Sequence, residues 1–390
     1  MRISRQCAIA GVGVTPQGKI YDRTTNDFAA DAVHLALENA GLSLNDLDGM
    51  LIQPGLDGVL NMGFQNYLGV MDLRLFNYIS SGGAGAGSMV QYAAMAINAG
   101  MCNVVACVYA DAPLQKERSA GDAYKDRGVL HQPGGYTSLL SAFGYYGANS
   151  GYALATRQHM ETYGTTEDHL GQVAVSTREW ATMNPRAQQR KPMTMEDHHN
   201  SRYVVEPLHL FDCCLVSNGG VAVIVTSAER ARDLKQKPAY INGMGQGHFG
   251  DSQRRGREPF IQTGLKPAAE MAYRMAGVGP EDIDACELYD CYTYTVIVSL
   301  EDCGFCAKGE GGPYIADGKL GPGGALPTNT GGGQLSGYYM WGMTPLSEAV
   351  LQLQGNEGER QVPNLNNVLV TGNGGVLSYH AALVLGAQPS

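Results

Sequence analysis

The sequence has no long hydrophobic run. No stretch approaches the roughly 18 apolar residues that a membrane-spanning helix needs, and the N-terminal segment MRISRQCAIAGVGVTP lacks the apolar core of a signal peptide. Basic residues are also scarce, with 27 Lys and Arg against 37 Asp and Glu and a net charge of −10. General nucleic-acid binding needs a basic face to neutralise phosphates, so the charge argues against that class. We expect a soluble, cytoplasmic protein.

Motifs for metal ions and dinucleotides are incomplete. The nine cysteines are scattered, and an odd number suits reduced thiols better than a disulfide framework. The CGFC segment at 303–306 has the spacing of half a zinc site, but no second cysteine pair lies nearby in the sequence. The GVGVTP segment at 11–16 lacks the third glycine of a dinucleotide fingerprint. We therefore predict neither a metal ion nor a bound cofactor.

What the sequence does contain is an α/β pattern that occurs twice. In each copy a helical segment with an Ala-Ala pair ends at a glycine, Gly41 or Gly277, and two aspartates follow that glycine at offsets of five and seven residues. A short strand closes each copy, GMLIQ in the first and ACELYD in the second. We therefore expect two duplicated α/β halves, residues 1–235 and 236–390.

A long segment interrupts the first half. Residues 112–207 are rich in Tyr, Gly, Arg and His and contain two predicted helices. This length is too great for a simple loop, so we expect an inserted loop subdomain. Insertions on a rigid scaffold often carry substrate contacts.

Four segments, in this order, resemble motifs of the thiolase superfamily. They are LFDCCLVSNGGVAVIVTSAERA, ELYDCYTYTVIVSLEDCGFCAKGEGG, PTNTGGGQLSGYYMWGMTPLSEA and TGNGGVLSYHAALVLG. Within the superfamily the sequence is most similar to the sterol-carrier-protein and lipid-transfer-protein-like branch. The resemblance implies a thiolase-like fold, in which the two α/β halves stack in αβαβα layers.

The resemblance also shows that the catalytic residues of thiolases are replaced. Gly83 stands where the nucleophilic cysteine belongs, and Tyr289 and Tyr339 stand where two active-site histidines belong. The second cysteine is replaced by Thr371 or Gly372. A thiolase needs a thiolate nucleophile. A phenol, with an ordinary pKa of about 10, can instead donate a proton, and can accept one where its neighbours stabilise the phenolate.

This replacement resembles the lipid-transfer-protein-type aldolases of steroid side-chain degradation, which lack the thiolase cysteine and use two tyrosines. That branch implies retro-aldol cleavage of a β-hydroxyacyl-CoA, a 17-hydroxy steroid with a C20-carboxyl-CoA side chain. The products would be a 17-keto steroid and propionyl-CoA. Tyr289 and Tyr339 would act as acid and base in an order that the sequence leaves open, and a shift of one residue would move the second role to Tyr338.

Further site residues are predicted around this pair. His380 is predicted to assist an oxyanion or proton step, and glycine-rich turns are expected to present N–H groups to the thioester. Asp290 and His380 each have a structural interpretation too, as a loop contact and as a satisfied buried histidine. The predicted substrate-binding residues are Gly83, Asp290, Tyr294, Asn329, Gly374 and Gly375, and CoA phosphates are expected near Arg157, Arg178, Arg190 or Lys191.

The resemblance implies partners as well. It implies a homodimer, an acyl-CoA substrate, and a small partner protein with an OB fold and a zinc ribbon that can form part of a hydratase. Two other functions stay open. One is a thiolase that cleaves an aromatic β-ketoacyl-CoA with a displaced nucleophile, Cys107, Cys286 or Cys291. The other is a non-catalytic acyl-CoA-binding scaffold for a partner hydratase.

Overall fold

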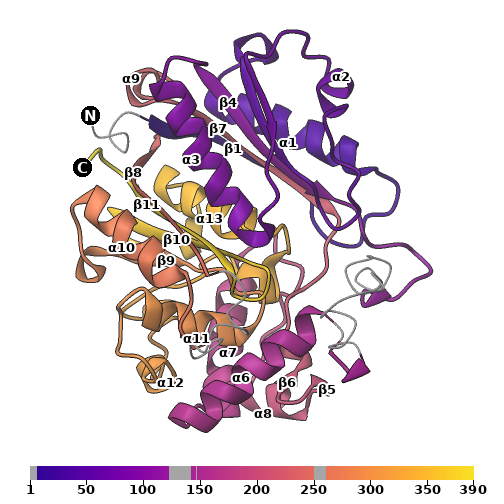
Figure 1. The fold of residues 1–390 in the computed structure, drawn as a ribbon, viewed down its shortest axis with the longest axis vertical. Coiled ribbons are helices and arrows are strands. Elements are labelled where there is room, and N and C mark those ends of the chain that lie inside the picture. The colour runs from indigo at the N-terminus through magenta and orange to yellow at the C-terminus, as the bar shows by residue number, and fades with distance from the viewer. Residues whose placement is uncertain (1–6, 123–141, 146, 250–260) are drawn as a thin grey trace.

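The protein is built on one large mixed sheet. The computed structural model describes residues 7–122, 142–145, 147–249 and 261–390. Within these ranges nine strands follow the order β3-β2-β4-β7-β1-β8-β11-β10-β9 (Figure 1). They are β1 (Cys7–Val14), β2 (Gly49–Gln53), β3 (Leu75–Tyr78), β4 (Val104–Asp111), β7 (Gly219–Ser227), β8 (Ala239–His248), β9 (Ala285–Glu287), β10 (Asn367–Gly374) and β11 (Tyr379–Gly386).

Helices cover the sheet in layers. α1 (Thr25–Ala40) packs on β1, β7 and β4, and α10 (Leu265–Ala276) packs on β8 and β11, so these two helices are the outer layers. α3 (Gly85–Asn98) and α13 (Met343–Gln354) contact strands of both halves and therefore lie between them. The αβαβα arrangement implied by the resemblance is confirmed. The remaining helices are α2 (Phe64–Leu68), α9 (Ala228–Arg232), α11 (Thr293–Asp302), α12 (Gly311–Tyr314) and those of the insertion described below.

The strands of the two halves form one continuous sheet. Ala8 pairs with Tyr240 and Ile9 with Ala239, so β1 and β8 join the halves in antiparallel fashion. The connection between the halves runs from the end of α9 to the start of β8. The predicted boundary after residue 235 lies in this connection.

Close helix–sheet packing recurs in both halves because glycines line the strand beneath each outer helix. A Cβ added to Gly13 of β1 would lie 2.2 Å from the carbonyl oxygen of Ala32 in α1. A Cβ added to Gly243 of β8 would lie 2.0 Å from the carbonyl oxygen of Ala272 in α10. Both helices present alanines to these strands and end at a glycine in the left-handed region, Gly41 or Gly277. The duplication seen in the sequence is thus a duplication of structure.

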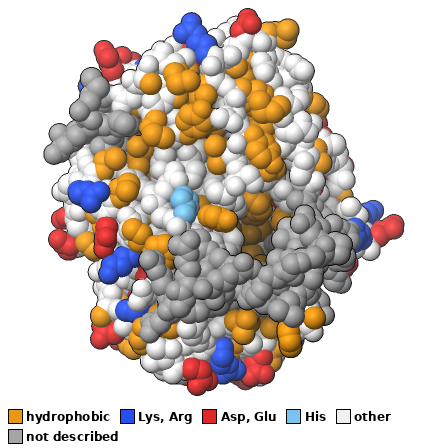
Figure 2. Space-filling view, viewed as in Figure 1, with side chains coloured by type: hydrophobic (Ala, Val, Ile, Leu, Met, Phe, Trp, Pro, Cys, Tyr) orange, Lys and Arg blue, Asp and Glu red, His pale blue; other side chains and the backbone are white. Residues whose placement is uncertain are grey.

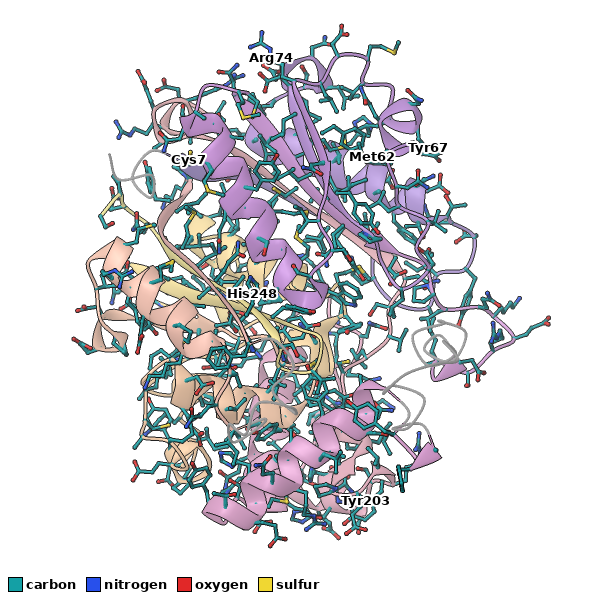
Figure 3. The ribbon with its side chains drawn as sticks, in the orientation of Figure 1. Cys7, Met62, Tyr67, Arg74, Tyr203 and His248 are labelled. Atoms are coloured by element: carbon teal, nitrogen blue, oxygen red, sulfur yellow. The ribbon has the colours of Figure 1, made fainter. Side chains whose placement is uncertain are left out.

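The insertion packs against the second half. Its described elements are α6 (Ala148–Tyr163), α7 (Glu167–Met183), α8 (Met195–Asn200) and the hairpin of β5 (Tyr203–Val205) and β6 (Leu208–His209), whereas 123–141 and 146 lie outside the described residues. Tyr152 of α6 and Leu170 of α7 belong to the same hydrophobic core as Tyr289 and Tyr339. Tyr203 marks the end of the molecule opposite Cys7 and Arg74 (Figure 3).

Among the described residues no helix is long and apolar enough to cross a membrane. No disulfide joins the nine cysteines, all of which lie within the described ranges. The same ranges contain no group of three or more His, Cys, Asp or Glu side chains arranged to hold a metal ion.

The close packing of α10 can be tested with Gly243→Ala. Because the added methyl group would meet a backbone carbonyl, we expect the free energy of unfolding to fall by about 1–3 kcal/mol. Chemical denaturation measures this difference. Gly121→Ala is the control, since Gly121 is exposed and the nearest atom to an added Cβ is Ser119 Oγ at 3.9 Å. Equal stability of the two variants would contradict the packing argument.

Candidate active site

Four segments meet near the ends of β9, the edge strand, and of its neighbour β10. Tyr289 follows β9, and Tyr338 and Tyr339 follow a single π-helical turn, Gly333–Gly337. The end of β10 supplies residues 371–374, and the short helical turn Gly82–Ala84 comes from the first half. The face of the molecule drawn in Figure 2 is hollowed near its centre, with hydrophobic side chains visible inside.

The structure brings the two predicted tyrosines together. The hydroxyl oxygens of Tyr289 and Tyr339 are 3.5 Å apart, and both side chains are at least nine-tenths buried. Each tyrosine is fixed by a hydrogen bond from its backbone N–H to a side-chain hydroxyl. Tyr289 N donates to Thr371 Oγ1 at 3.0 Å, and Tyr339 N donates to Ser217 Oγ at 2.9 Å. Thr371 of β10 and Ser217, which lies just before β7, therefore hold the pair in place.

Tyr338 faces a different environment. Its hydroxyl bonds Ser347 Oγ of α13 at 2.9 Å, and its ring belongs to the core between the two halves. Burial raises its pKa to about 12. Of the two adjacent tyrosines, Tyr339 is thus the one whose hydroxyl lies beside Tyr289.

Burial governs the protonation of Tyr289. It raises the pKa of the Tyr289 phenol well above its ordinary value, and the nearby Cys291 thiol acts in the same direction. A hydrogen bond with Tyr339 opposes the shift. Tyr289 is therefore a neutral phenol near neutral pH.

The Tyr289 ring occupies the space in which a side chain at position 83 would lie. A Cβ on Gly83 would be 2.1 Å from Tyr289 Cε2 and 2.3 Å from the carbonyl oxygen of Asn373. Neighbouring glycines are equally close: a Cβ on Gly374 would lie 2.2 Å from Ser81 O, and one on Gly372 would lie 2.6 Å from Gly83 O. The positions predicted for a nucleophile and a second cysteine are thus filled by backbone and by the phenol ring.

Asp290 holds the loop that carries Tyr339. Its carboxylate accepts from Gln334 N at 2.9 Å and 3.0 Å and from Leu335 N at 3.4 Å. Burial raises its pKa to about 7, although the backbone N–H groups favour the ionised form. The carboxylate is fully buried and holds the π-helical turn, and the substrate-binding role of Asp290 stays a prediction.

Asn329 connects the same two loops. Its Oδ1 accepts from Leu288 N at 2.7 Å, and its own N–H donates to Cys286 O at 2.9 Å. Its Nδ2 is buried without a hydrogen bond of normal geometry to any described residue. Asn329 therefore positions the Tyr289 loop and keeps one amide donor beside it.

Two other predicted residues lie differently. Tyr294 is fully buried on α11, where its ring meets His159 of α6 edge-on at 5.4 Å, and its substrate contact stays a prediction. His380 pairs with Asn373 across β11 and β10, and burial lowers its pKa to about 4. The structure records no hydrogen bond from His380 to either tyrosine within the described residues. A proton role for His380 would need an intervening group.

The turn after β10 has a left-handed backbone. Gly375 has a φ of 61°, and Val376 and Leu377 follow with values of 50° and 63°. Residues other than glycine rarely adopt this conformation, because it strains the backbone. Asn373 stabilises it, because its Oδ1 accepts from Leu377 N at 3.1 Å.

Sequence reasoning missed several residues of the site. Asn373 Nδ2 donates to the Tyr152 hydroxyl at 2.9 Å, and the Tyr152 ring stacks on Tyr292 at 4.4 Å. Thr371 and Ser217 were missed because a hydroxyl that accepts from a distant backbone N–H leaves no local pattern in the sequence. The insertion thus reaches the site through Tyr152.

The basic residues expected near the CoA phosphates lie in different environments. Arg178 is buried and supports the π-helical turn, with Nε donating to Ser336 Oγ at 2.8 Å and Nη1 to Lys191 O at 3.1 Å. Arg157 is half-exposed and pairs with Glu206 at 3.0 Å. The roles of Arg157, Arg190 and Lys191 stay predictions.

The displaced cysteines are poor nucleophiles where the structure puts them. Cys107, Cys286 and Cys291 are all buried, and burial raises the pKa of each thiol, to about 12 for Cys291. A thiolate is the reactive form, so these thiols lack the required charge state near neutral pH.

Comparisons with known proteins agree with this geometry. The family described as thiolase C-terminal domain-like matches residues 245–387, which include both tyrosines. A steroid side-chain-cleaving aldolase of Thermomonospora curvata is 40% identical over 98% of each chain. A 17-hydroxy-3-oxo-4-pregnene-20-carboxyl-CoA lyase of Mycobacterium tuberculosis is 37% identical over 98% of this chain and 100% of its own.

A solved structure extends the likeness to three dimensions. It is that of an Ltp2-ChsH2(DUF35) aldolase, and the match covers 100% of both chains with a TM-score of 0.88 and 37% identity. The chain belongs to the thiolase superfamily, in the branch of the steroid side-chain-cleaving aldolases.

The contact between Gly83 and the Tyr289 ring can be tested by a double-mutant cycle. Gly83→Ala is expected to lower the free energy of unfolding by about 1–3 kcal/mol through overpacking. Tyr289→Ala removes the ring but leaves the Asn373 carbonyl oxygen 2.3 Å from the added Cβ, so adding Gly83→Ala to that variant should cost less than in the wild type without becoming neutral. Denaturant unfolding of the four proteins measures the coupling. Additive effects would show that the ring does not constrain position 83.

Proposed function

We propose that this protein is a carbon–carbon lyase that cleaves a β-hydroxyacyl-CoA by a retro-aldol reaction. The proposed substrate is a 17-hydroxy steroid with a C20-carboxyl-CoA side chain, and the products are a 17-keto steroid and propionyl-CoA. The observation that carries the proposal is the buried pair of hydroxyls, 3.5 Å apart, in place of thiolase groups. Membership of the aldolase branch supports it, since one relative is named an aldolase and another a CoA lyase.

The pair can act as a proton relay. The substrate hydroxyl gives its proton to one phenol as its C–O bond becomes the ketone carbonyl. The Cα–Cβ bond breaks, and its electron pair forms the thioester enolate. The first phenol passes its own proton to the second, and the second protonates Cα. No net proton is consumed, and both tyrosines finish neutral.

This relay suits a neutral pair. Burial holds the pKa of Tyr289 well above its ordinary value, so a standing phenolate at Tyr289 is disfavoured. In a relay each phenol gains one proton as it loses another, and no isolated charge has to be buried. Which tyrosine meets the substrate hydroxyl and which meets Cα is left open.

Partners complete the proposal. A homodimer would cover the sheet edge at β3, where Tyr78 is 45% exposed, together with Met95 of the adjacent α3, which is also 45% exposed. Figure 2 shows hydrophobic side chains gathered on the face that carries α3. The similar aldolase structure carries a second component in its name, ChsH2(DUF35), which supports a partner protein here, and the family resemblance implies that this partner has an OB fold and a zinc ribbon. The cytoplasmic location stays a prediction.

Removal of either hydroxyl tests the reaction. Tyr289→Phe and Tyr339→Phe should each lower kcat about 10²–10⁴-fold, the usual contribution of acid–base catalysis. Release of propionyl-CoA from the 17-hydroxy acyl-CoA, with the partner present, measures it. Tyr338→Phe is the matched control, because its hydroxyl bonds Ser347 and should leave kcat close to that of the wild type. Undiminished turnover in both Phe variants would favour the scaffold function.

Thiol alkylation separates the aldolase from a displaced-cysteine thiolase. Iodoacetamide should leave the cleavage of the hydroxyacyl-CoA within about twofold of its untreated rate, because the candidate thiols are buried and protonated. Cleavage of a β-ketoacyl-CoA, measured in parallel, should be absent before and after treatment. Loss of activity together with a trapped acyl-cysteine would establish the thiolase instead.

A further inference from the structure

Two buried carboxyl groups share one hydroxyl directly behind the tyrosine loops. Thr330 Oγ1 lies 2.8 Å from Glu287 Oε1 and 2.8 Å from Glu348 Oε1. A threonine hydroxyl has a single proton to donate. If both carboxyls were ionised, only one of these two short contacts could contain a hydrogen. The geometry therefore requires a proton on one of the two carboxyls.

The charges around the cluster identify which carboxyl is neutral. Arg360 binds Glu348 and Glu357, and Arg186 binds Glu357 at 3.1 Å and 3.2 Å. These two guanidinium groups balance the two carboxylates that they contact. Glu287 makes no such ion pair with a described residue, so its ionisation would add an uncompensated charge in a fully buried position.

The surroundings of Glu287 also favour its protonated form. Burial raises its pKa well above the ordinary value, and Glu348 acts in the same direction, while Thr330 and Arg360 oppose the shift. The titratable and charged groups that face it are Glu348 on α13, Arg360 on the following turn, and Cys286 beside it on β9. Glu357, Arg186 and Tyr338 complete the cluster around Glu348 and Arg360.

The Thr330 hydroxyl links the two chain segments that carry Tyr289 and Tyr339. Glu287 is the last residue of β9, two positions before Tyr289, and Thr330 stands nine positions before Tyr339. Thr330 N also donates to Glu287 Oε1 at 3.1 Å, and Arg360 NH1 donates to Thr330 O at 3.3 Å. A change in the hydrogen bond between Glu287 and Thr330 would thus alter the spacing of the two loops.

We propose that Glu287 is a positioning residue that works as a neutral carboxylic acid. It donates its proton to Thr330 Oγ1, Thr330 donates to the Glu348 carboxylate, and this chain fixes the separation of the Tyr289 and Tyr339 loops. Ionisation of Glu287 breaks the chain and loosens the pair. The catalytic part of this inference rests on the proposed function, whereas the protonation state does not.

Stability against pH tests the protonation state without any substrate. A carboxyl whose pKa is raised by folding stabilises the native state below its unfolded pKa of about 4.3, and this stability is lost as pH rises towards its folded pKa. Glu287→Gln keeps the neutral shape and removes this loss. The folding constant of Glu287→Gln relative to wild type should therefore rise with pH above about 4.3, by up to about tenfold per unit.

A matched control makes the comparison specific. Glu281→Gln changes an exposed carboxylate six residues earlier in the sequence and should show no such trend. Infrared difference spectra of wild type minus Glu287→Gln should contain the C=O stretch of a protonated carboxyl at neutral pH. Two results would overturn the proposal. One is a ratio of folding constants, Glu287→Gln over wild type, that stays flat or falls as pH rises. The other is a carboxylate band, in place of the protonated C=O stretch, in the infrared difference spectrum.

The positioning role needs a kinetic readout. Glu287→Gln should keep kcat within about threefold of wild type near neutral pH, because the amide NH₂ still donates to Thr330, and should retain activity at alkaline pH where the wild type declines. Glu287→Asp, which keeps the acid but shortens the side chain, should lower kcat at least tenfold with KM nearly unchanged. Equal pH profiles in Glu287→Gln and wild type would contradict the role. Failure of the retro-aldol assay in wild type would defeat the proposed function while leaving the stability result intact.

Discussion

The contact of the Tyr289 ring with Gly83 is the constraint on which the rest of the site depends. The ring lies where a side chain at position 83 would have to be, so a nucleophile at position 83 and this phenol at position 289 exclude one another. The Tyr289 ring and the Asn373 carbonyl oxygen both occupy this space, so a glycine at position 83 and a tyrosine at position 289 fit one another.

The surrounding architecture keeps that contact rigid. The glycines at 83, 372 and 374 bring backbone against backbone, so the loops of the two halves cannot separate without losing packing. Asp290 fastens the π-helical turn before Tyr339 through three backbone contacts, and Arg178 fastens it from the insertion through Ser336. A relay between two phenols needs a fixed oxygen–oxygen distance, and each of these groups helps to set it.

Much of this could be predicted from the sequence, for identifiable physical reasons. The halves and the outer helices were predictable because Ala-rich helices ending at Gly41 and Gly277 are local patterns. Tyr289 and Tyr339 were found because they stand in motifs with a fixed order. The surroundings of Tyr294 and Asp290 could not be predicted, because proximity in sequence does not give direction: Tyr294 lies on α11, which is buried along its whole length, and Asp290 bonds the neighbouring loop. Ser217 and Thr371 act over 122 and 82 residues, beyond any local pattern.

The groups closest to the reaction are mostly uncharged, and this limits the chemistry. Burial holds Tyr289 neutral, and it lowers the pKa of His380 to about 4, so that His380 is neutral as well. Behind the loops, the two arginines pair with Glu348 and Glu357, so Glu287 has no ion-pair partner among the described residues. A thiolase runs on a thiolate beside a cationic or polar partner, which requires stabilised charge in the site. A buried, neutral site favours a step in which protons and electrons move in a closed cycle, so that no group ends with a new charge. Retro-aldol cleavage through two phenols meets this condition, and attack by a buried thiol does not.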